Sequence, residues 1–403
     1  MHIPTNEHDE LDLNNVKITP PTSNESEVNK AKRNAFIIPV AVLAGLVIVL
    51  GVIYFFNSKK EGGFFNPTAI NDLIDGGDSK EDLFENPLTG ELVPMKNAEP
   101  WKDIRPMGVM VNNAVPARPQ SGLIYADVIY EIVAEGGITR FLPFFLSNTP
   151  EKIGPVRSTR EYYLVLVKEM GDAMLMHIGW SPQALEAIET WPVRSLGRGG
   201  GQFWRDQNRL DSGVATEHTA YVDGTELRDL GNDLGWQGTD EEFRPYLFKD
   251  EADIPQETEM CYVGECNPIT IDFWYEGDYS AIWEYDRTSN SYLRFMGYDS
   301  EENPIPHKDQ ETGEQIKVKN FIVQFASETQ VVGDEKGRLE YELIGSGTGI
   351  VFIDGTANTV TWSKAGRDDR TLFYYENGEE VEFNRGKFWI SIVPDRNVDQ
   401  VNY

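Results

Sequence analysis

The stretch RPMGVMVNNAVPARPQSGLIYADVIYEIVAEGGITRFLPFFL, residues 105–146, decides the fold class of this chain. The apolar run at 107–111 predicts a short strand, and 126–133 predicts a strand or a short helix. The run at 141–146 is equally apolar, but Pro143 cannot donate to a strand ladder and favours an edge strand or a bend. We therefore expect β-structure at the start of the folded part.

The next residues alternate helix and strand signals. STREYYLVLVKEM at 158–170 has helical spacing and opens with a pattern typical of a capping box. Residues 173–178 predict a buried strand. Residues 181–190 predict a helix with Ser181 as N-cap and Pro182 at the first helical position. Together with the first stretch, these signals predict an α+β or α/β domain over 101–257.

The composition changes near residue 258 towards short strands rich in β-branched and aromatic residues and bounded by turn residues. Strands at this spacing predict a β-rich second domain over 258–403. The expected strands are 269–273, 281–285, 292–296, 320–325, 349–352, 359–362, 371–375 and 387–393.

The front of the chain differs from both domains. Residues 1–34 are polar and predict a disordered cytoplasmic tail. Residues 35–56, AFIIPVAVLAGLVIVLGVIYFF, carry no charge and span roughly 30 Å as a helix, which predicts one transmembrane helix. Residues 57–100 are rich in Gly, Asn, Asp and Pro and predict a flexible linker.

The charges around this segment predict its orientation. Basic residues gather before it and are fewer after it, which favours a cytoplasmic N-terminus and an extracytoplasmic main body. The basic residues are Lys17, Lys30, Lys32 and Arg33 before the segment, and Lys59 and Lys60 after it.

The chain is strongly acidic, with 36 basic against 66 acidic residues and a net charge of −30. Such a surface repels polyphosphates, which argues against nucleic acid as a partner. The two cysteines, Cys261 and Cys266, form a disulfide candidate if Val263-Gly264 is a hairpin turn, and free thiols are the alternative. We expect no cofactor and no metal site, because no zinc, calcium, P-loop or dinucleotide-binding pattern is present.

Several long motifs resemble one known family. These are the run from Arg105 to Tyr163, HIGWSPQ at 177–183, GQFWRD at 201–206 and EHTAY at 217–221, followed by NFIVQF, GSGTGIVFIDG, TWSKAGRDDRT and GKFWISIVP in the β-rich part. They resemble the YerB-type lipoproteins, the family of domain of unknown function 3048, over about residues 100–400. The resemblance implies a bacterial extracytoplasmic envelope protein without an established activity. Such relatives are held by a lipid on a cysteine, but no cysteine lies near 35–60, so the helix itself is the expected anchor.

A dense set of charged residues stands beside the apolar strands of the first domain. Four arginines within 43 residues predict an anion pocket, because the guanidinium fork binds carboxylate or phosphate through two hydrogen bonds. Ordinary salt bridges to two nearby glutamates are the alternative. The residues are Arg118, Arg140, Arg157 and Arg160, with Glu131 and Glu135.

Histidines give a second hypothesis. His177 and His218, together with Glu131 or Asp206, would form a general acid/base or metal site if they converge. Hydrogen-bonding structural roles are the alternative for each histidine. His307 and Asp309 form a weaker metal-like pair.

Aromatic residues of the same domain offer a surface for a sugar ring. Trp180, Trp204 and Phe203 predict a stacking wall, and core packing is the alternative. Arg205 and Asp206 beside Trp204 join the expected ligand-binding residues. For the glycine-rich loop 197–201 we consider two alternatives, a loop that cradles a ligand and a plain loop.

Three functions follow from these patterns. The first is a membrane-anchored envelope protein that binds an anionic or glycan ligand in an arginine-rich cleft of the first domain. The second is an enzyme that processes a cell-wall or phospho-glycan, with His177, His218 and a carboxylate as acid and base. The third is a scaffold that docks on another envelope protein.

Overall fold

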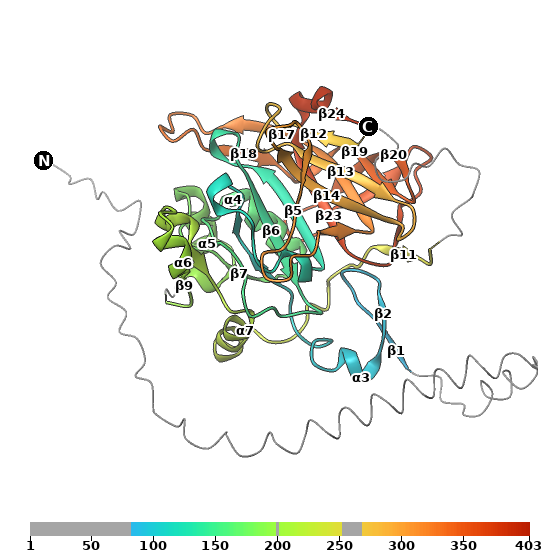
Figure 1. Cartoon of the computed structure of the whole chain (residues 1–403). Coiled ribbons are helices and arrows are strands. Elements are labelled where there is room, and N and C mark those ends of the chain that lie inside the picture. Colours follow the sequence, from blue (N-terminus) through green and yellow to red (C-terminus); the bar gives the residue numbers. More distant parts are fainter. Residues whose placement is uncertain (1–81, 199–200, 252–267) are drawn as a thin grey trace, which may run out of the picture. The chain divides into compact units, whose positions relative to one another are not determined.

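The structure is a computed structural model that describes residues 82–198, 201–251 and 268–403 (Figure 1). Glu81–Tyr403 forms one compact unit. The transmembrane helix expected at 35–56 and the pair Cys261 and Cys266 lie outside the described residues. Within the described ranges, no helix is long and apolar enough to cross a membrane.

The end of the expected linker is folded. β1 (Leu83–Glu85) and β2 (Leu92–Pro94) pair as an antiparallel hairpin, and the short helix α3 (Met95–Ala98) follows. Phe84 of β1 packs edge-on against Trp101, with ring centroids 5.4 Å apart. The prediction of a flexible linker is therefore wrong for residues 83–98, because their apolar side chains pack together.

One 12-stranded sheet runs through the described unit in the order β21-β20-β19-β17-β23-β5-β6-β3-β7-β8. β18 pairs with β17, and β4 pairs with β6. The first region supplies β3 (Met107–Val109), β4 (Val111–Asn112), β5 (Val128–Val133), β6 (Thr139–Phe145), β7 (Met174–Met176) and β8 (Arg194–Ser195). The second region supplies β17 (Asn320–Gln330), β18 (Leu339–Glu342), β19 (Gly345–Ile353), β20 (Thr356–Lys364), β21 (Leu372–Tyr375) and β23 (Phe388–Pro394).

The two regions join where β5 and β23 pair in parallel, from Val128 with Phe388 to Ile132 with Ile392. On its other side, β23 pairs in parallel with β17. Every residue of β5 and β23 is buried. A strand from the end of the chain thus lies at the centre of the sheet, and one hydrogen-bonded surface connects both regions.

A second sheet of six strands covers part of the first (Figure 1). Trp283 of this sheet stacks on Phe321 of β17, with ring centroids 4.4 Å apart, and meets Trp389 of β23 edge-on at 5.3 Å. The strands are β12 (Ile269–Ile271), β13 (Ala281–Asp286), β14 (Ser291–Tyr298), β15 (Pro304–Pro306), β16 (Lys317–Val318) and β24 (Val401–Asn402).

Side chains of β5 are covered on both faces of the sheet. Glu131 meets Arg294 of the second sheet, while the neighbouring Tyr130 donates its hydroxyl to Glu169 of α4 (Glu161–Glu169). Because successive residues of a strand point to opposite faces, both faces need an apolar cover. This explains why VIYEIV is buried throughout.

The remaining elements are short. They are α5 (Pro182–Thr190), β9 (Trp204–Arg205), α6 (Gln207–Asp211), β10 (Ala220–Tyr221), α7 (Gly224–Asp233), β11 (Leu247–Lys249) and β22 (Glu382–Asn384). The predicted start of α5 is confirmed, since Ser181 Oγ accepts the Ala184 N–H at 3.1 Å and Pro182 is the first helical residue. The fold comprises a mixed α+β N-terminal region and a β-rich C-terminal region.

The expected capping box at the start of α4 is wrong. The helix begins at Glu161, and its N-cap Arg160 makes no side-chain capping bond. The residues before it are extended because Thr159 N–H donates to Gly179 O at 3.1 Å and forms a bridge with Trp180. Tertiary pairing thus holds this segment out of the helix.

Pro143 does not lie in an edge strand, because β6 is flanked by β5 on one side and by β3 and β4 on the other. Pro143 pairs with Ile129 of β5. Across from it, the partner strand is interrupted between Val109 of β3 and Val111 of β4. A proline is therefore tolerated in the sheet interior where the ladder on its other side is broken.

Candidate functional site

Polar residues gather where the parallel strands β3, β7 and β8 end. Asn112 ends β4, and His177 directly follows β7. In α/β sheets, the carboxyl ends of parallel strands are the usual place for a ligand. This edge is therefore the first place to look for a site.

An extended segment, residues 155–160, closes this edge of the sheet. Pro155 O accepts the Asn112 N–H at 2.8 Å, and Arg157 N–H donates to Met110 O at 2.9 Å. On the other side, Ile178 N–H donates to Arg157 O at 3.1 Å. The backbone thus fixes the origin of the Arg157 and Arg160 side chains, both of which are partly exposed.

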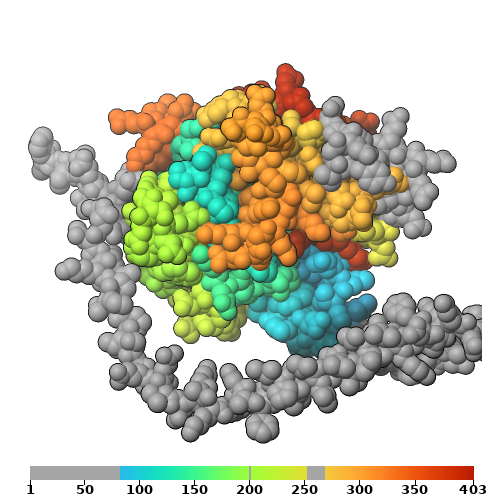
Figure 2. Space-filling model, in the orientation of Figure 1, coloured from blue at the N-terminus to red at the C-terminus, as the bar shows by residue number. Residues whose placement is uncertain are grey.

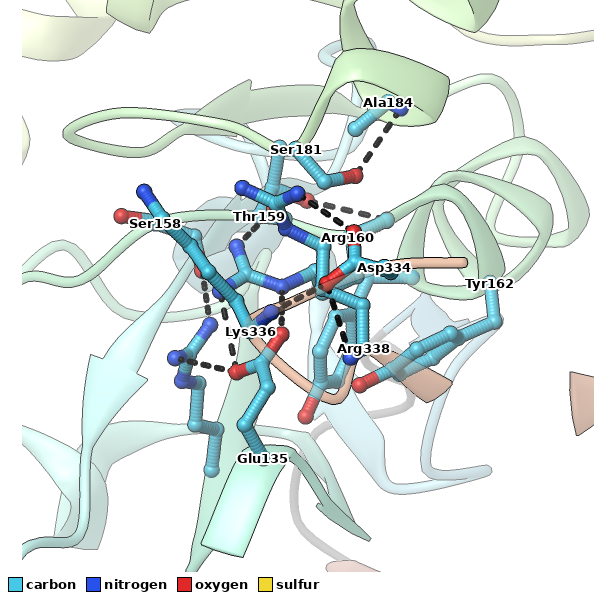
Figure 3. Close-up of polar contacts among 12 residues, drawn as sticks. Glu135, Ser158, Thr159, Arg160, Tyr162, Ser181, Ala184, Asp334, Lys336 and Arg338 are labelled. Atoms are coloured by element: carbon cyan, nitrogen blue, oxygen red, sulfur yellow. Dashed lines mark hydrogen bonds and ion pairs between the residues drawn. The ribbon is translucent and has the colours of Figure 1, made fainter. Parts of the chain in front are cut away.

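One carboxylate, Glu135, holds two arginines at this edge (Figure 3). Arg160 Nη2 lies 3.0 Å and Arg140 Nη2 lies 3.1 Å from Glu135 Oε2, and Arg160 Nε donates to Oε1. Burial opposes ionisation of Glu135, but the hydrogen bond from Arg160 and the two positive charges outweigh it and lower its pKa. Two cations against one anion leave a net positive charge.

The same two arginines also hold the extended segment. Arg140 Nη1 donates to Ser158 O, and Arg160 Nη1 donates to Thr159 O, each at 2.8 Å. Burial, together with the neighbouring charge of Arg160, lowers the pKa of Arg140 to about 10. Burying the two positive charges of Arg140 and Arg160 side by side costs free energy, so a negative charge next to them stabilises the pair.

A second group of basic residues lies at the other end of the segment, with two arginines and one neutral histidine. Asn112 Nδ2 is 2.8 Å from His218 Nδ1, so the amide donates and the neutral ring carries its proton on Nε2. Burial lowers the pKa of His218, and the charge of Arg157 lowers it further. The Arg157 charge also lowers the pKa of Arg205, although burial is the larger cause there. Arg157, Arg205 and His218 are therefore close enough to interact.

We call these residues together the cationic edge. It contains four arginines and one histidine, with Glu135 as the one carboxylate of the set and the exposed Glu217 beside Arg205 and His218. The members are Glu135, Arg140, Arg157, Arg160, Arg205 and His218. In a chain of net charge −30, this is a local excess of positive charge.

His177 lies beneath this edge and is fully buried. Its Nδ1 is 2.9 Å from Gly179 O, and its Nε2 is 2.7 Å from Ser195 Oγ. Burial lowers the pKa of His177 to about 4. A neutral ring with both nitrogens occupied links the ends of β7 and β8, and Trp180 packs edge-on against it at 6.0 Å.

Glu131 belongs to the contact between the two regions. Both of its oxygens accept from Arg294 Nη2, at 2.8 and 3.0 Å, and Thr139 and Trp389 also donate to it. Burial raises its pKa, and Arg294 opposes that shift. Thus Glu131 has partners of its own, and the catalytic role predicted for it with His177 and His218 stays a prediction.

Arg118 also turns towards the second region. Its Nε donates to Asn113 O at 3.2 Å, and its guanidinium lies 5.1 Å from the Tyr279 ring centroid. Burial lowers the pKa of Arg118 to about 10. The structure therefore places Arg118 near Glu131 rather than at the cationic edge.

Trp204, Arg205 and Asp206 have structural contacts of their own. Trp204 stacks on Tyr221 with ring centroids 6.4 Å apart and remains 37% exposed, so it is available to a ligand. The Arg205 guanidinium lies 5.4 Å from the ring centroid of Phe203. Asp206 caps α6 by accepting the Arg209 N–H at 3.2 Å.

The metal-like pair and the glycine loop are also placed. His307 Nε2 lies 2.9 Å from Gln120 Oε1, whereas Asp309 accepts the Gly122 N–H at 2.6 Å. Each residue therefore ties the second region to the first through separate contacts. Within the described residues, no cluster of three or more potential ligands is arranged to hold a metal ion. Gly197 packs against His177, and residues 199–200 lie outside the described residues.

A pocket of about 480 Å³ lies beside the cationic edge. Gly136, the residue after Glu135, lines it, as do residues of the β17–β18 hairpin and of the second sheet's loops. Its lining includes Gly136, Trp274, Glu328, Lys336, Leu339 and Arg396. Apart from the Gly136–Gly137 turn, sequence reasoning missed these residues, because they are distant in sequence and carry no local motif.

These features define a class of protein. Its two regions share one mixed sheet, and its arginines gather at the carboxyl edge of the parallel strands. The chain belongs to the family described as "Protein of unknown function (DUF3048)". The N-terminal domain of that family matches residues 88–237, and the C-terminal domain matches residues 269–390.

Two comparisons support this membership. The chain is 30% identical over 320 residues to "Putative lipoprotein YerB" of Bacillus subtilis (strain 168), which covers 78% of this chain and 88% of that protein. The crystal structure of YerB protein from Bacillus subtilis matches with a TM-score of 0.64 at 30% identity. That match covers 79% of this chain and 99% of the YerB chain. The family resemblance expected from the sequence is confirmed.

Proposed function

We propose that this chain is an extracytoplasmic, membrane-anchored binding protein that recognises an anionic group of a cell-envelope glycan at the cationic edge. The name of the YerB relative, a lipoprotein, supports a location at the outer side of a membrane. The uncharged segment 35–56 supports an anchor made by a single helix with a cytoplasmic N-terminus.

The observation that carries the proposal is the charge balance of the cationic edge. Arg140 and Arg160 share the carboxylate of Glu135. Arg157 and Arg205 add two further positive charges beside the exposed carboxylate of Glu217, so four arginines face two carboxylates. Screening limits electrostatic attraction to about 8–10 Å at ordinary salt. A ligand at this edge therefore responds to the local cations, and the remote acidic surface repels it only weakly.

The chemistry of the edge selects the ligand group. A guanidinium binds carboxylate and phosphate through paired N–H donors, and such charge-assisted bonds are stronger than neutral ones. Trp204, which is 37% exposed next to Arg205, offers a face for a ring that carries the anion. A carboxylated or phosphorylated sugar combines both features.

The experiment compares matched ligands on the full-length chain in detergent. Calorimetric titration with N-acetylmuramic acid and with N-acetylglucosamine isolates the contribution of the carboxylate. Titration with glycerol 3-phosphate tests whether the site binds a phosphate group instead. We expect one of the anions to bind and the uncharged sugar to bind at least about 10-fold more weakly, the value of one charge-assisted hydrogen bond. Affinity should also fall as salt is raised.

The variant Arg157→Ala should lower the affinity for the anion about 10-fold or more. Arg244→Ala is the matched control, because Arg244 is an exposed arginine of a different segment that pairs with Glu380. Equal affinity for charged and uncharged sugars, or equal losses in both variants, contradicts the proposal. If Arg157→Ala fails to fold, the salt dependence of the wild-type chain decides.

A further inference from the structure

The surface beside the cationic edge continues into a pocket. Glu135 belongs to the edge, and the next residue, Gly136, lines the pocket of about 480 Å³. Gly136 adopts a φ of +71°, and a Cβ there would meet no atom within 4 Å. The turn between β5 and β6 thus connects a residue of the cationic edge with a residue of the pocket lining. The pocket volume falls within the ~300–1,000 Å³ typical of ligand sites.

The wall of the pocket is organised around Glu328, whose side chain is only 4% exposed. Trp274 Nε1 donates to Glu328 Oε2 at 3.3 Å, and the Tyr341 hydroxyl donates to the same oxygen at 2.5 Å. Arg396 pairs with the other carboxylate oxygen. These contacts fix the plane of the partly exposed indole, so the pocket has a preformed aromatic surface.

The opposite wall is the tip of the β17–β18 hairpin. Asp334 accepts the backbone N–H of Lys336 at 2.8 Å and pairs with Arg338 Nη1 at 2.7 Å, which holds the turn. Lys336 itself is exposed and lines the pocket. Figure 3 draws this tip in the same close-up as Glu135 and Arg160, and Figure 2 shows the orange hairpin surface next to the green and teal surfaces of the first region. The ammonium group of Lys336 is therefore an exposed cation on this wall of the pocket.

We propose that the ligand is an extended acidic oligosaccharide, with one anionic sugar at the cationic edge and further units in the pocket. This inference rests on the proposed function and names its ligand class. The pocket offers the partly exposed indole of Trp274 and the exposed ammonium group of Lys336, which suit the ring faces and hydroxyl groups of sugars. A peptide side chain would need a deeper apolar cavity, but the apolar side chains of the lining are those of Trp274 and Leu339.

The test compares N-acetylmuramic acid with a tetrasaccharide of alternating N-acetylglucosamine and N-acetylmuramic acid, titrated into the full-length chain. The tetrasaccharide should bind about 10-fold or more tightly, because added contacts reinforce the first. Trp274→Ala and Lys336→Ala should lower the affinity for the tetrasaccharide and leave that for the single sugar unchanged. Lys317→Ala, at another exposed lysine, is the matched control and should change neither.

The outcomes separate the two proposals. Equal affinities for the single sugar and the tetrasaccharide overturn the extended ligand and leave the proposed function standing. Equal losses of affinity for the single sugar and the tetrasaccharide in Lys336→Ala also overturn the extended ligand. This variant decides the question if Trp274→Ala does not fold. Binding of the tetrasaccharide alone, unaffected by Arg157→Ala, overturns the anion site instead. Absence of binding by both saccharides overturns the extended ligand, and if glycerol 3-phosphate does not bind either, the proposed function is overturned as well. Competition by an acidic peptide overturns the choice of a saccharide.

Discussion

Arg294 Nη2 lies 2.8 Å from Oε2 and 3.0 Å from Oε1 of Glu131, and both side chains are completely buried. The guanidinium carbon also lies 4.3 Å from the ring centroid of Trp389. Glu131 comes from β5 and Arg294 from β14, so the pair joins the two regions face to face. Glu169 of α4 repeats the arrangement with Lys364 at 2.9 Å. The contact between the regions is therefore ionic as well as apolar.

Replacing Glu131 by Gln should lower the free energy of unfolding by about 3–5 kcal/mol, because it leaves the Arg294 charge buried without its partner. Arg294→Met should have a similar effect by stranding Glu131. The double variant should lose less than the sum of the two single losses, by roughly 1 kcal/mol or more. Urea unfolding of the full-length chain, followed by tryptophan fluorescence, measures all three values.

The control for this cycle is Glu189→Gln, which removes the exposed ion pair of Glu189 with Arg198 at 3.2 Å. Exposed pairs contribute about 0–1 kcal/mol, so this variant should unfold almost as the wild type does. Strictly additive losses at Glu131 and Arg294 would mean that the pair is not coupled.

His177 should give the protein a pH-dependent stability. Burial lowers its pKa to about 4 from an ordinary value of 6.5. The unfolded chain gains a proton near pH 6.5, whereas the folded protein resists protonation down to about 4. The contribution is thus fully present above 6.5 and lost as pH falls towards 4, with a size of up to ~3 kcal/mol.

The measurement compares the pH dependence of the unfolding free energy in the wild type and in His177→Gln. The variant should lose the part of the slope between pH 6.5 and 4, whatever its absolute stability. The Asp and Glu carboxylates titrate in both proteins, so the difference between the two curves isolates the contribution of His177. Parallel curves would show that the ring is accessible to protons in the fold.

Local signals in the sequence were enough for much of the fold. Ser181 followed by Pro182 marks the start of α5, because capping and a fixed φ act within one turn. The apolar runs gave the approximate places of β5, β6 and β7, and the change of composition marked the β-rich region. The pairing of β5 with β23 had no local signal, because its partners lie about 260 residues apart in the chain.

The candidate site was also predictable from the sequence only in part. Glu135, Arg140 and Arg160 lie within 26 residues of one another, and the sequence allowed for both salt bridges and an anion pocket among them. Their salt bridges are present. Glu131 has the same residue type and a similar position, but its partner is Arg294, which is 163 residues away. Only the tertiary fold distinguishes the two glutamates.

Gly197 should resist substitution although its backbone is not left-handed. A Cβ at this position would stand 2.1 Å from His177 O and 3.0 Å from atoms of the His177 ring. Because the nearest atom belongs to the backbone, Gly197→Ala should lower the free energy of unfolding by about 1–3 kcal/mol. Gly366→Ala is the control, since its nearest atom is a movable carboxylate oxygen of Asp369 at 2.9 Å. Equal stabilities of the two variants in urea would contradict the close contact at Gly197.

The two serines that precede helices should respond differently to alanine. Ser181 caps α5 through its Oγ, so Ser181→Ala should lower the free energy of unfolding by about 1 kcal/mol. Ser158 occupies the capping position that the sequence pattern favours, but α4 begins three residues later, after Arg160. Ser158→Ala should therefore cost less than half as much, because it removes no cap from a helix. Comparable losses of unfolding free energy in the two variants would indicate that Ser158 caps α4. Such a result would contradict the extended conformation of the segment that carries Arg157 and Arg160.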